Sequence, residues 1–104
     1  MYSRVTLLEI DTLRAEIDEV VERFTTELLP GLRELPGFEG IFVLVTPQGK
    51  GMVVSLWDSE EAIAGSAAAA AGAVQEFVTL YRSPPGREHY RVAYAEMPRV
   101  TVES

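Results

Sequence analysis

The sequence predicts a single α+β domain of the ferredoxin-like type, in which β-α-β-β-α-β order gives a four-stranded antiparallel sheet with two helices on one face. Strand-like and helix-like segments alternate along the chain as two similar strand-helix-strand halves. Residues 35–40, Leu-Pro-Gly-Phe-Glu-Gly, end one helix and lead directly into the apolar stretch at 41–45. Residues 55–61, Ser-Leu-Trp-Asp-Ser-Glu-Glu, end a strand and begin the second helix.

The first strand and the first helix come from the N-terminal third of the chain. Residues 2–10 are rich in β-branched and apolar side chains, which is typical of a strand, and Asp11 is placed to cap the helix that follows. We expect this helix over residues 12–29. Because Pro30 lacks an amide donor, we expect the helix to break there, with residues 31–36 forming a turn. The apolar positions with helical spacing are Leu13, Ile17, Val20, Val21, Phe24, Leu28 and Leu32.

A hairpin and a second helix follow. Strands at 41–46 and 52–57 are joined by Pro-Gln-Gly-Lys-Gly at 47–51, whose proline and glycines suit a tight connection. Asp58 or Ser59 caps the second helix, and a glutamate pair in its first turn meets the positive end of the helix dipole. Its expected buried positions are Ile63, Ala67, Ala70, Val74, Phe77, Val78 and Tyr81.

The C-terminal part completes the predicted domain. Two prolines and a glycine make residues 82–87 a loop, and residues 89–97 then read as the fourth strand. We therefore expect one domain over residues 1–97, followed by a C-terminal tail at 98–104.

Composition narrows the possible partners and location. The 104-residue chain carries a formal charge of −7 and no basic cluster, which argues against nucleic acid and anionic membrane as partners. It contains no cysteine, so disulfides and thiolate metal chemistry are excluded, and a reducing cytoplasm is the expected location. No apolar run approaches the roughly twenty residues that a membrane span requires. The acidic residues at the second helix diverge and have no histidine beside them, so we predict no metal site.

Both faces of the central hairpin are apolar, although two helices cover only one face of a sheet. Each large apolar side chain left in water would forfeit about 1.5–3 kcal/mol. A second copy packed sheet against sheet is the simplest cover, so we predict a homodimer. Its interface would contain Phe42, Leu44, Val54 and Leu56.

The Leu-Pro-Gly-Phe turn at 35–38, the strand that follows it, and the Leu-Trp-Asp-Ser-Glu-Glu junction at 56–61 resemble the antibiotic biosynthesis monooxygenase superfamily. The resemblance spans residues 5–96 and implies a dimeric α+β barrel. Members include cofactor-free enzymes that oxygenate aromatic polyketides, enzymes that degrade haem, and proteins that isomerise or bind small organic molecules. On the family pattern the helix-facing side of the sheet carries Ile41, Val43, Val45, Val53, Ser55 and Trp57.

The haem-degrading branch fits this sequence poorly. Its members carry an asparagine on the first strand, a tryptophan early in the second helix and an iron-binding histidine later in that helix. This chain has no asparagine, and the tryptophan and histidine positions fall at Ser66 and Glu76. The single histidine, His89, lies beyond the Pro-Pro loop. The resemblance therefore argues against haem, and we expect no cofactor.

The resemblance favours a protein that binds a small apolar or aromatic molecule, with cofactor-independent oxygenation of an aromatic or polyketide-like substrate as the leading activity. Such an enzyme needs a dry pocket, a group that favours the ionised substrate, and donors for developing negative charge. Candidate catalytic residues are His89, Trp57 and Tyr81; each also has a purely structural interpretation. The expected ligand pocket contains Ser55, Trp57, Ser66, Ala70 and Tyr81.

The run of five alanines at 67–71 leaves two interpretations open. Small side chains allow the helix to pack closely on the sheet, or they leave a hollow beneath Ala67, Ala70 and Ala71 for a ligand. Two other functions also stay open. A non-catalytic binding or scaffold domain would keep the fold without the chemistry, and a polyketide cyclase or isomerase would need an acid-base group such as His89.

Overall fold

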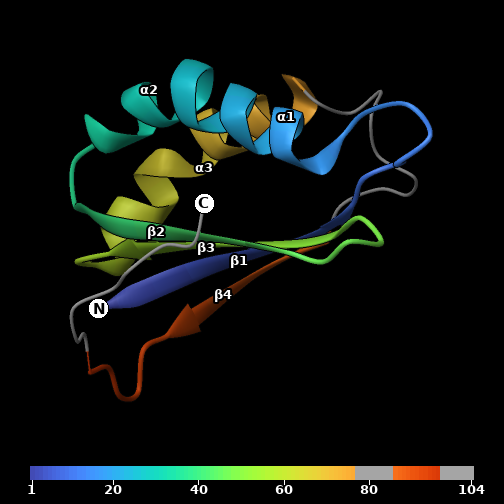
Figure 1. Ribbon diagram of the computed structural model, residues 1–104. Coiled ribbons are helices and arrows are strands. Elements are labelled where there is room, and N and C mark those ends of the chain that lie inside the picture. Colours follow the sequence, from blue (N-terminus) through green and yellow to red (C-terminus); the bar gives the residue numbers. More distant parts are fainter. Residues whose placement is uncertain (77–85, 97–104) are drawn as a thin grey trace.

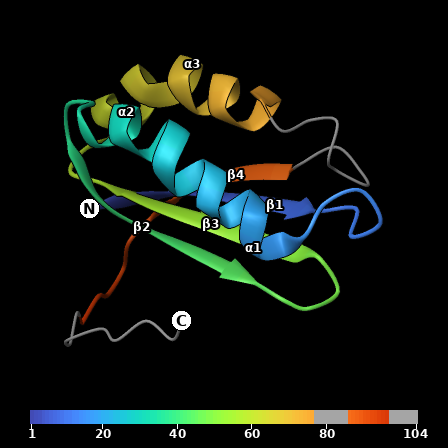
Figure 2. The same cartoon turned by 45° about the horizontal axis from the view of Figure 1, so that its top comes forward.

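The molecule consists of a sheet with all its helices on one face, as predicted. A computed structural model of the chain describes residues 1–76 and 86–96. Figures 1 and 2 show the helices as one layer above the sheet. The strands are antiparallel and lie in the order β2-β3-β1-β4. Their bounds are β1 Tyr2–Glu9, β2 Phe38–Val45, β3 Lys50–Trp57 and β4 Gly86–Arg91.

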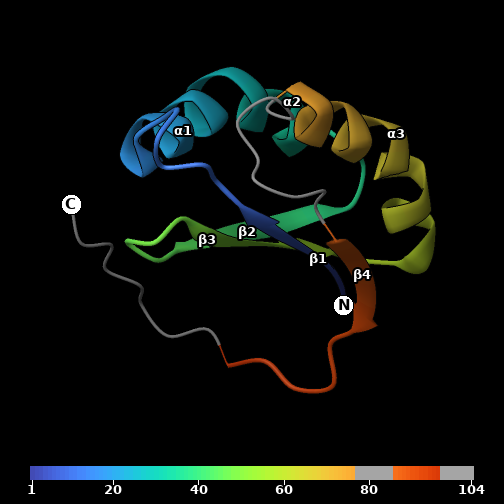
Figure 3. The ribbon, with the colours of Figure 1, turned by 90° about the vertical axis from the view of Figure 1, so that its right-hand side faces the viewer.

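Strand pairing explains where the observed strands differ from the predicted ones. β2 begins at Phe38, three residues before the predicted start, because Phe38 pairs with Trp57 at the end of β3. β4 begins at Gly86, before the predicted start at residue 89, because Gly86 pairs with Leu7 of β1. The predicted fourth strand at 89–97 is wrong at its C-terminal end. β1 starts at Tyr2, so pairing stops at Arg91, and residues 92–96 leave on the side away from the helices (Figure 3).

The first helical region begins later and ends later than predicted. Asp11 does not cap a helix; its carboxylate accepts the Leu13 amide at 3.0 Å, and its carbonyl accepts the next two amides in a turn. Leu13 is consequently 93% exposed rather than part of the buried stripe. The helix starts with α1 (Ile17–Arg23), behind a Glu16 N-cap that makes no side-chain hydrogen bond.

Pro30 does not end this helix, contrary to the prediction. A π-helical segment η1 (Phe24–Leu28) precedes the proline, and α2 (Leu29–Arg33) contains it near its start. The Leu29 amide bonds to the Phe24 carbonyl, five residues back. This wider turn displaces the carbonyl that the proline ring would otherwise meet, so the helix continues to Arg33.

The second helix, α3 (Glu60–Glu76), is fixed at its start by two features that the sequence contained. The Ser59 hydroxyl accepts the Ala62 amide at 3.1 Å, so Ser59 is the cap. Gly37 has φ +84° and its carbonyl accepts the Asp58 amide at 2.9 Å. A β-carbon on Gly37 would collide with Ala62 and Asp58, so this glycine lets the turn before β2 touch the start of α3.

The apolar core lies between the helices and the sheet. Its buried members are Ile10, Leu29, Leu32, Trp57 and Ile63, whereas Leu56 is buried on the opposite face of the sheet. The rings of Phe38 and Trp57 meet edge to face with centroids 5.5 Å apart. Within residues 1–76 and 86–96, no helix is both long and apolar enough to cross a membrane.

Candidate functional site

A cavity of about 90 Å³ lies between the first helix and the sheet. Its walls are almost entirely apolar. α1 buries none of its residues completely, because its inward side chains border this space instead of a packed surface. The helical lining comes from Ile17, Val20, Val21, Phe24, Leu32 and Ala70. The sheet lining includes all six residues expected on the helix-facing side: Ile41, Val43, Val45, Val53, Ser55 and Trp57.

The polar part of the lining comes from neighbouring positions on β1 and β3. Arg4 pairs with Ser55 across the two strands, and Thr6 follows Arg4 on the same face. Arg4 is only 4% exposed. A buried guanidinium is therefore part of a wall that consists mostly of apolar side chains.

Within the described part of the chain, three hydrogen bonds hold the Arg4 guanidinium. Nη2 donates to the Ile63 carbonyl at 2.8 Å, and Nη1 donates to the Ser66 hydroxyl at 3.0 Å. Nε donates to His89 Nε2 at 3.3 Å. The central guanidinium carbon of Arg4, Cζ, lies 5.9 Å from the centroid of the Trp57 ring, at the outer limit of a cation–π contact. These contacts fix the charge between β1, β4 and α3.

Trp57 and Ser55 form a second buried pair. Trp57 is 1% exposed at the end of β3, and its Nε1 donates to the Ser55 hydroxyl at 2.9 Å. The hydrogen bond orients both side chains toward one wall of the cavity. The buried Trp57 ring thus serves the core and the cavity together.

The remaining residues of the expected pocket have different positions. Ala70 is half-buried and lines the cavity, whereas Ser66 is buried outside the lining, where its hydroxyl donates to the Ile63 carbonyl and accepts from Arg4. Tyr81 lies outside the described residues. The expected burial of Ala67 is wrong, because Ala67 is exposed, as is Ala71; of the three alanines considered for a hollow, Ala70 lines the cavity. The helix directs Ile63, Ser66 and Ala70 inward instead, and the cavity lies mainly under α1.

His89 is separate from this cavity. It is exposed on β4, and it borders a second pocket of about 300 Å³ between the start of α3 and the edge strand. Its Nε2 accepts the Arg4 N–H. His89 therefore contacts the site through Arg4 rather than through the cavity wall.

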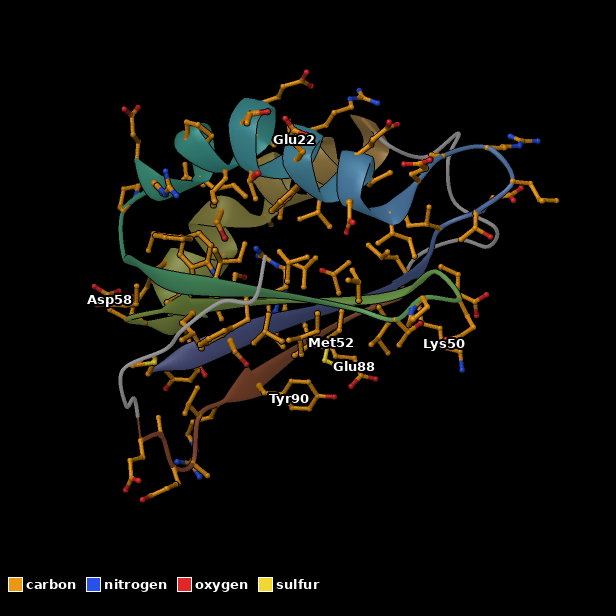
Figure 4. All side chains as sticks on the ribbon, viewed as in Figure 1. Glu22, Lys50, Met52, Asp58, Glu88 and Tyr90 are labelled. Carbon is orange, nitrogen blue, oxygen red and sulfur yellow. The ribbon has the colours of Figure 1, made fainter. Side chains whose placement is uncertain are left out.

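The opposite face of the sheet carries a broad apolar surface. Leu44 is 53% exposed, Phe42 and Val54 are half-buried, and Leu56 is already buried within the single chain. Figure 4 shows Met52 and Tyr90 on this open face together with Glu88. The Tyr90 hydroxyl donates to the Glu88 carboxylate, and this hydrogen bond raises the pKa of Tyr90 above its ordinary 10.0.

Arg4 and Thr6 are site residues that were not predicted from the sequence. A signal was present: they share strand parity with Leu8 and Ile10, so they had to face the same side as those apolar residues. An arginine placed on the helix-facing side of a strand has to find buried partners, and this is the position that Arg4 occupies.

Solved structures share this fold over nearly the whole chain. ActVA-Orf6, a monooxygenase from Streptomyces coelicolor solved with the ligand nanaomycin D, has 21% identity and a TM-score of 0.70, covering 94% of this chain and 92% of that one. A variant of SnoaB, a cofactor-independent oxygenase from Streptomyces nogalater, has 10% identity and a TM-score of 0.71, covering 90% and 94%. The heme-degrader MhuD from Mycobacterium tuberculosis, solved with two hemes in its active site, has 18% identity and a TM-score of 0.68, covering 93% and 100%.

No protein-family model matches the sequence, and no curated protein matches it. At identities of 10% to 21%, the likeness to these structures concerns the fold. The sequence motifs and the observed topology agree with it. The chain has the ferredoxin-like α+β fold of the antibiotic biosynthesis monooxygenase structures.

Proposed function

We propose that the protein binds a small, mostly apolar or aromatic molecule in the cavity under α1, and that it acts on this molecule as a cofactor-independent monooxygenase. The observation that carries the proposal is an apolar cavity of about 90 Å³ with Arg4 in its wall. Apolar walls with a few converging polar groups are typical of sites for small organic ligands. The oxygenases of the same fold, ActVA-Orf6 and SnoaB, support oxygenation of an aromatic or polyketide-like substrate as the reaction.

The chemistry proposed requires little from the protein. An ionised phenolic substrate supplies all the electrons and dioxygen is the oxidant. One oxygen atom becomes the new carbonyl of a quinone product, and the other leaves as water with the two hydrogens that the phenol loses. The Arg4 charge favours the ionised substrate, and the apolar walls strengthen that interaction by excluding water. In this proposal Trp57 orients the aromatic ring.

Haem does not fit the described site. The one histidine of the chain is outside the cavity, and its Nε2 already accepts a hydrogen bond from the Arg4 cation. Iron ligation would compete directly with that contact. We therefore assign no step of the proposed reaction to haem.

Binding without catalysis is the second candidate. The position of His89 argues against a cyclase or isomerase, because an acid-base group outside the cavity wall leaves such an enzyme without its proton carrier. The same observation does not affect an oxygenase that relies on the Arg4 charge. Dependence of turnover on dioxygen distinguishes the two enzymatic functions from each other, and binding without turnover identifies a binding domain.

Oxygen uptake with phenolic compounds of one to three aromatic rings tests the proposed reaction. We expect uptake in the wild-type protein and a loss of about 100-fold in kcat/KM for Arg4→Met, because the charge that stabilises the ionised substrate is gone. Arg33→Met removes an exposed arginine at the end of α2 and serves as the matched control. Equal uptake by the two variants would contradict a role for Arg4.

We also propose that a second copy of the chain covers the open face of the sheet, with Phe42, Leu44, Val54 and Leu56 at the interface. Light scattering after size exclusion tests this directly. Leu44→Glu should give monomers, since it places a charge on a residue that is 53% exposed on that face. Leu13→Glu, on a side chain 93% exposed in the turn before α1, should leave the dimer intact. A cytoplasmic location stays a prediction from the cysteine-free composition.

A further inference from the structure

We propose that the cavity selects ligands carrying an acceptor oxygen at the Ser55 end, and that Ser55 and Thr6 are the specificity-determining hydroxyls. The acceptor is a phenol, phenolate or carbonyl oxygen. This inference rests on the proposed binding in the cavity and specifies what that ligand must offer.

The Ser55 hydroxyl has a hydrogen to donate. Its oxygen accepts from Trp57 Nε1 at 2.9 Å, which occupies one lone pair and leaves the O–H hydrogen unused. Among the described residues no acceptor takes this hydrogen. Ser55 is only 7% exposed and lines the cavity, so a ligand placed there is the available partner.

Thr6 provides a second hydroxyl on the same wall. It is 5% exposed, lines the cavity, and makes no side-chain hydrogen bond within the described part of the chain. That part also contains no fully enclosed polar side-chain atom without a partner. The Thr6 oxygen is therefore reachable and opens onto the cavity that the residue lines.

The charge of Arg4 determines which kind of oxygen suits these hydroxyls. Arg4 lies across the strand pair from Ser55 and two residues before Thr6. All three border the cavity. A cation between two hydroxyl donors favours an oxygen with full or partial negative charge over a donor group such as an amine. The apolar remainder of the wall accommodates the hydrocarbon part of the ligand.

The test uses 1-naphthol and 1-methylnaphthalene, two probes of similar shape that differ in the oxygen. The chain contains a single tryptophan, so the one indole N–H resonance in a nitrogen-proton NMR spectrum reports Trp57 at the cavity wall. Titrating each probe against this resonance gives both dissociation constants. The quantity of interest is the affinity ratio of naphthol to methylnaphthalene, because hydrophobic contributions largely cancel in it.

We expect Ser55→Ala and Thr6→Val each to lower this ratio about 3- to 10-fold, the effect of one neutral hydrogen bond. Affinity for 1-methylnaphthalene should not fall. Ser3→Ala is the matched control, because Ser3 is an equally buried serine on the opposite face of the sheet and should leave the ratio unchanged. Ser55→Ala and Thr6→Val each remove one hydroxyl, so the affinity ratio measured in either variant that folds tests the proposal.

Two other outcomes are distinguishable. If both probes shift the Trp57 resonance and the ratio is the same in all variants, the cavity binds aromatic molecules without reading their oxygen, and this inference is overturned while the proposed binding stands. If neither probe shifts the resonance, the cavity is not a binding site and both proposals are wrong.

Discussion

Replacing Ala70 by leucine should fill the cavity without destabilising the fold. Ala70 is half-buried on α3 and lines the cavity of about 90 Å³. A single water needs roughly 10–15 Å³ on this scale, so the space accommodates the three added carbons. Each buried methylene contributes about 0.8 kcal/mol, or about 2.4 kcal/mol in all, and ordering the leucine costs about 0.5–1 kcal/mol. The expected net gain is about 1–2 kcal/mol.

Urea unfolding followed by Trp57 fluorescence measures this change, since Trp57 is the single tryptophan and is fully buried. With a slope of about 1–3 kcal/mol per molar urea, the midpoint should rise by roughly 0.3–2 M. Binding of 1-naphthol should weaken at least about tenfold in the same variant, because its space is occupied. Ala71→Leu, at the next and exposed residue, should change stability by no more than about 0.5 kcal/mol and leave binding intact.

A decrease of about 1–3 kcal/mol in the free energy of unfolding of Ala70→Leu would contradict this prediction. A loss of that size is the cost of forcing extra carbons into a packed interface. It would mean that the alanine run serves close packing of α3 on the sheet.

Three further predictions concern the fold around the site. Gly37→Ala should destabilise the protein by about 2–4 kcal/mol in urea unfolding, because Gly37 has φ +84° and a β-carbon there would collide with the start of α3. Its control is Gly72→Ala, at an exposed position of α3 with open space around it, which should stabilise the protein by about 0.5–1 kcal/mol. Ser59→Ala should cost about 1 kcal/mol through loss of the α3 cap, and Ser59→Asp should restore it; equal stability of the two variants would contradict the capping role. Glu88→Gln should lower the pKa of Tyr90 toward its ordinary value in an NMR titration, because the carboxylate that accepts the Tyr90 hydroxyl hydrogen is gone. Because the pKa of Tyr90 is raised in the folded state, the hydrogen bond between Tyr90 and Glu88 stabilises the fold below pH 10, and this contribution is lost as the pH rises through the pKa of Tyr90. An unchanged Tyr90 titration in Glu88→Gln would contradict the role of this hydrogen bond.

The sequence predicted the fold because its strong signals were local. Residues 41–45 and 52–57 are apolar runs with a turn between them, and the glycine and proline positions have few structural alternatives. The assignment of alternate residues to the helix-facing side was also correct, since side-chain parity follows from the strand itself.

The errors have physical causes that depend on long-range or competing contacts. Asp11 can either cap a helix or bind its own neighbours in a turn, and the sequence alone does not rank these options. The π-helical turn that carries the helix past Pro30 has no sequence signal of its own. The end of β4 depends on where β1 begins, which is a property of the pairing partner.

The site was predicted in part for a similar reason. Ser55 and Trp57 were identified because a polar residue and a large ring interrupt an apolar strand. Arg4 was missed because its partners, Ser66 and His89, lie more than sixty residues away in the chain and become neighbours only when β1, β4 and α3 meet.

A crystal structure of the protein grown with 1-naphthol tests the central claim most directly. We expect the naphthalene rings between α1 and the sheet, with the hydroxyl oxygen within hydrogen-bond distance of Ser55 Oγ and on the Arg4 side of the cavity. Side chains filling the space under α1, or a probe bound elsewhere with this space unchanged, would contradict it.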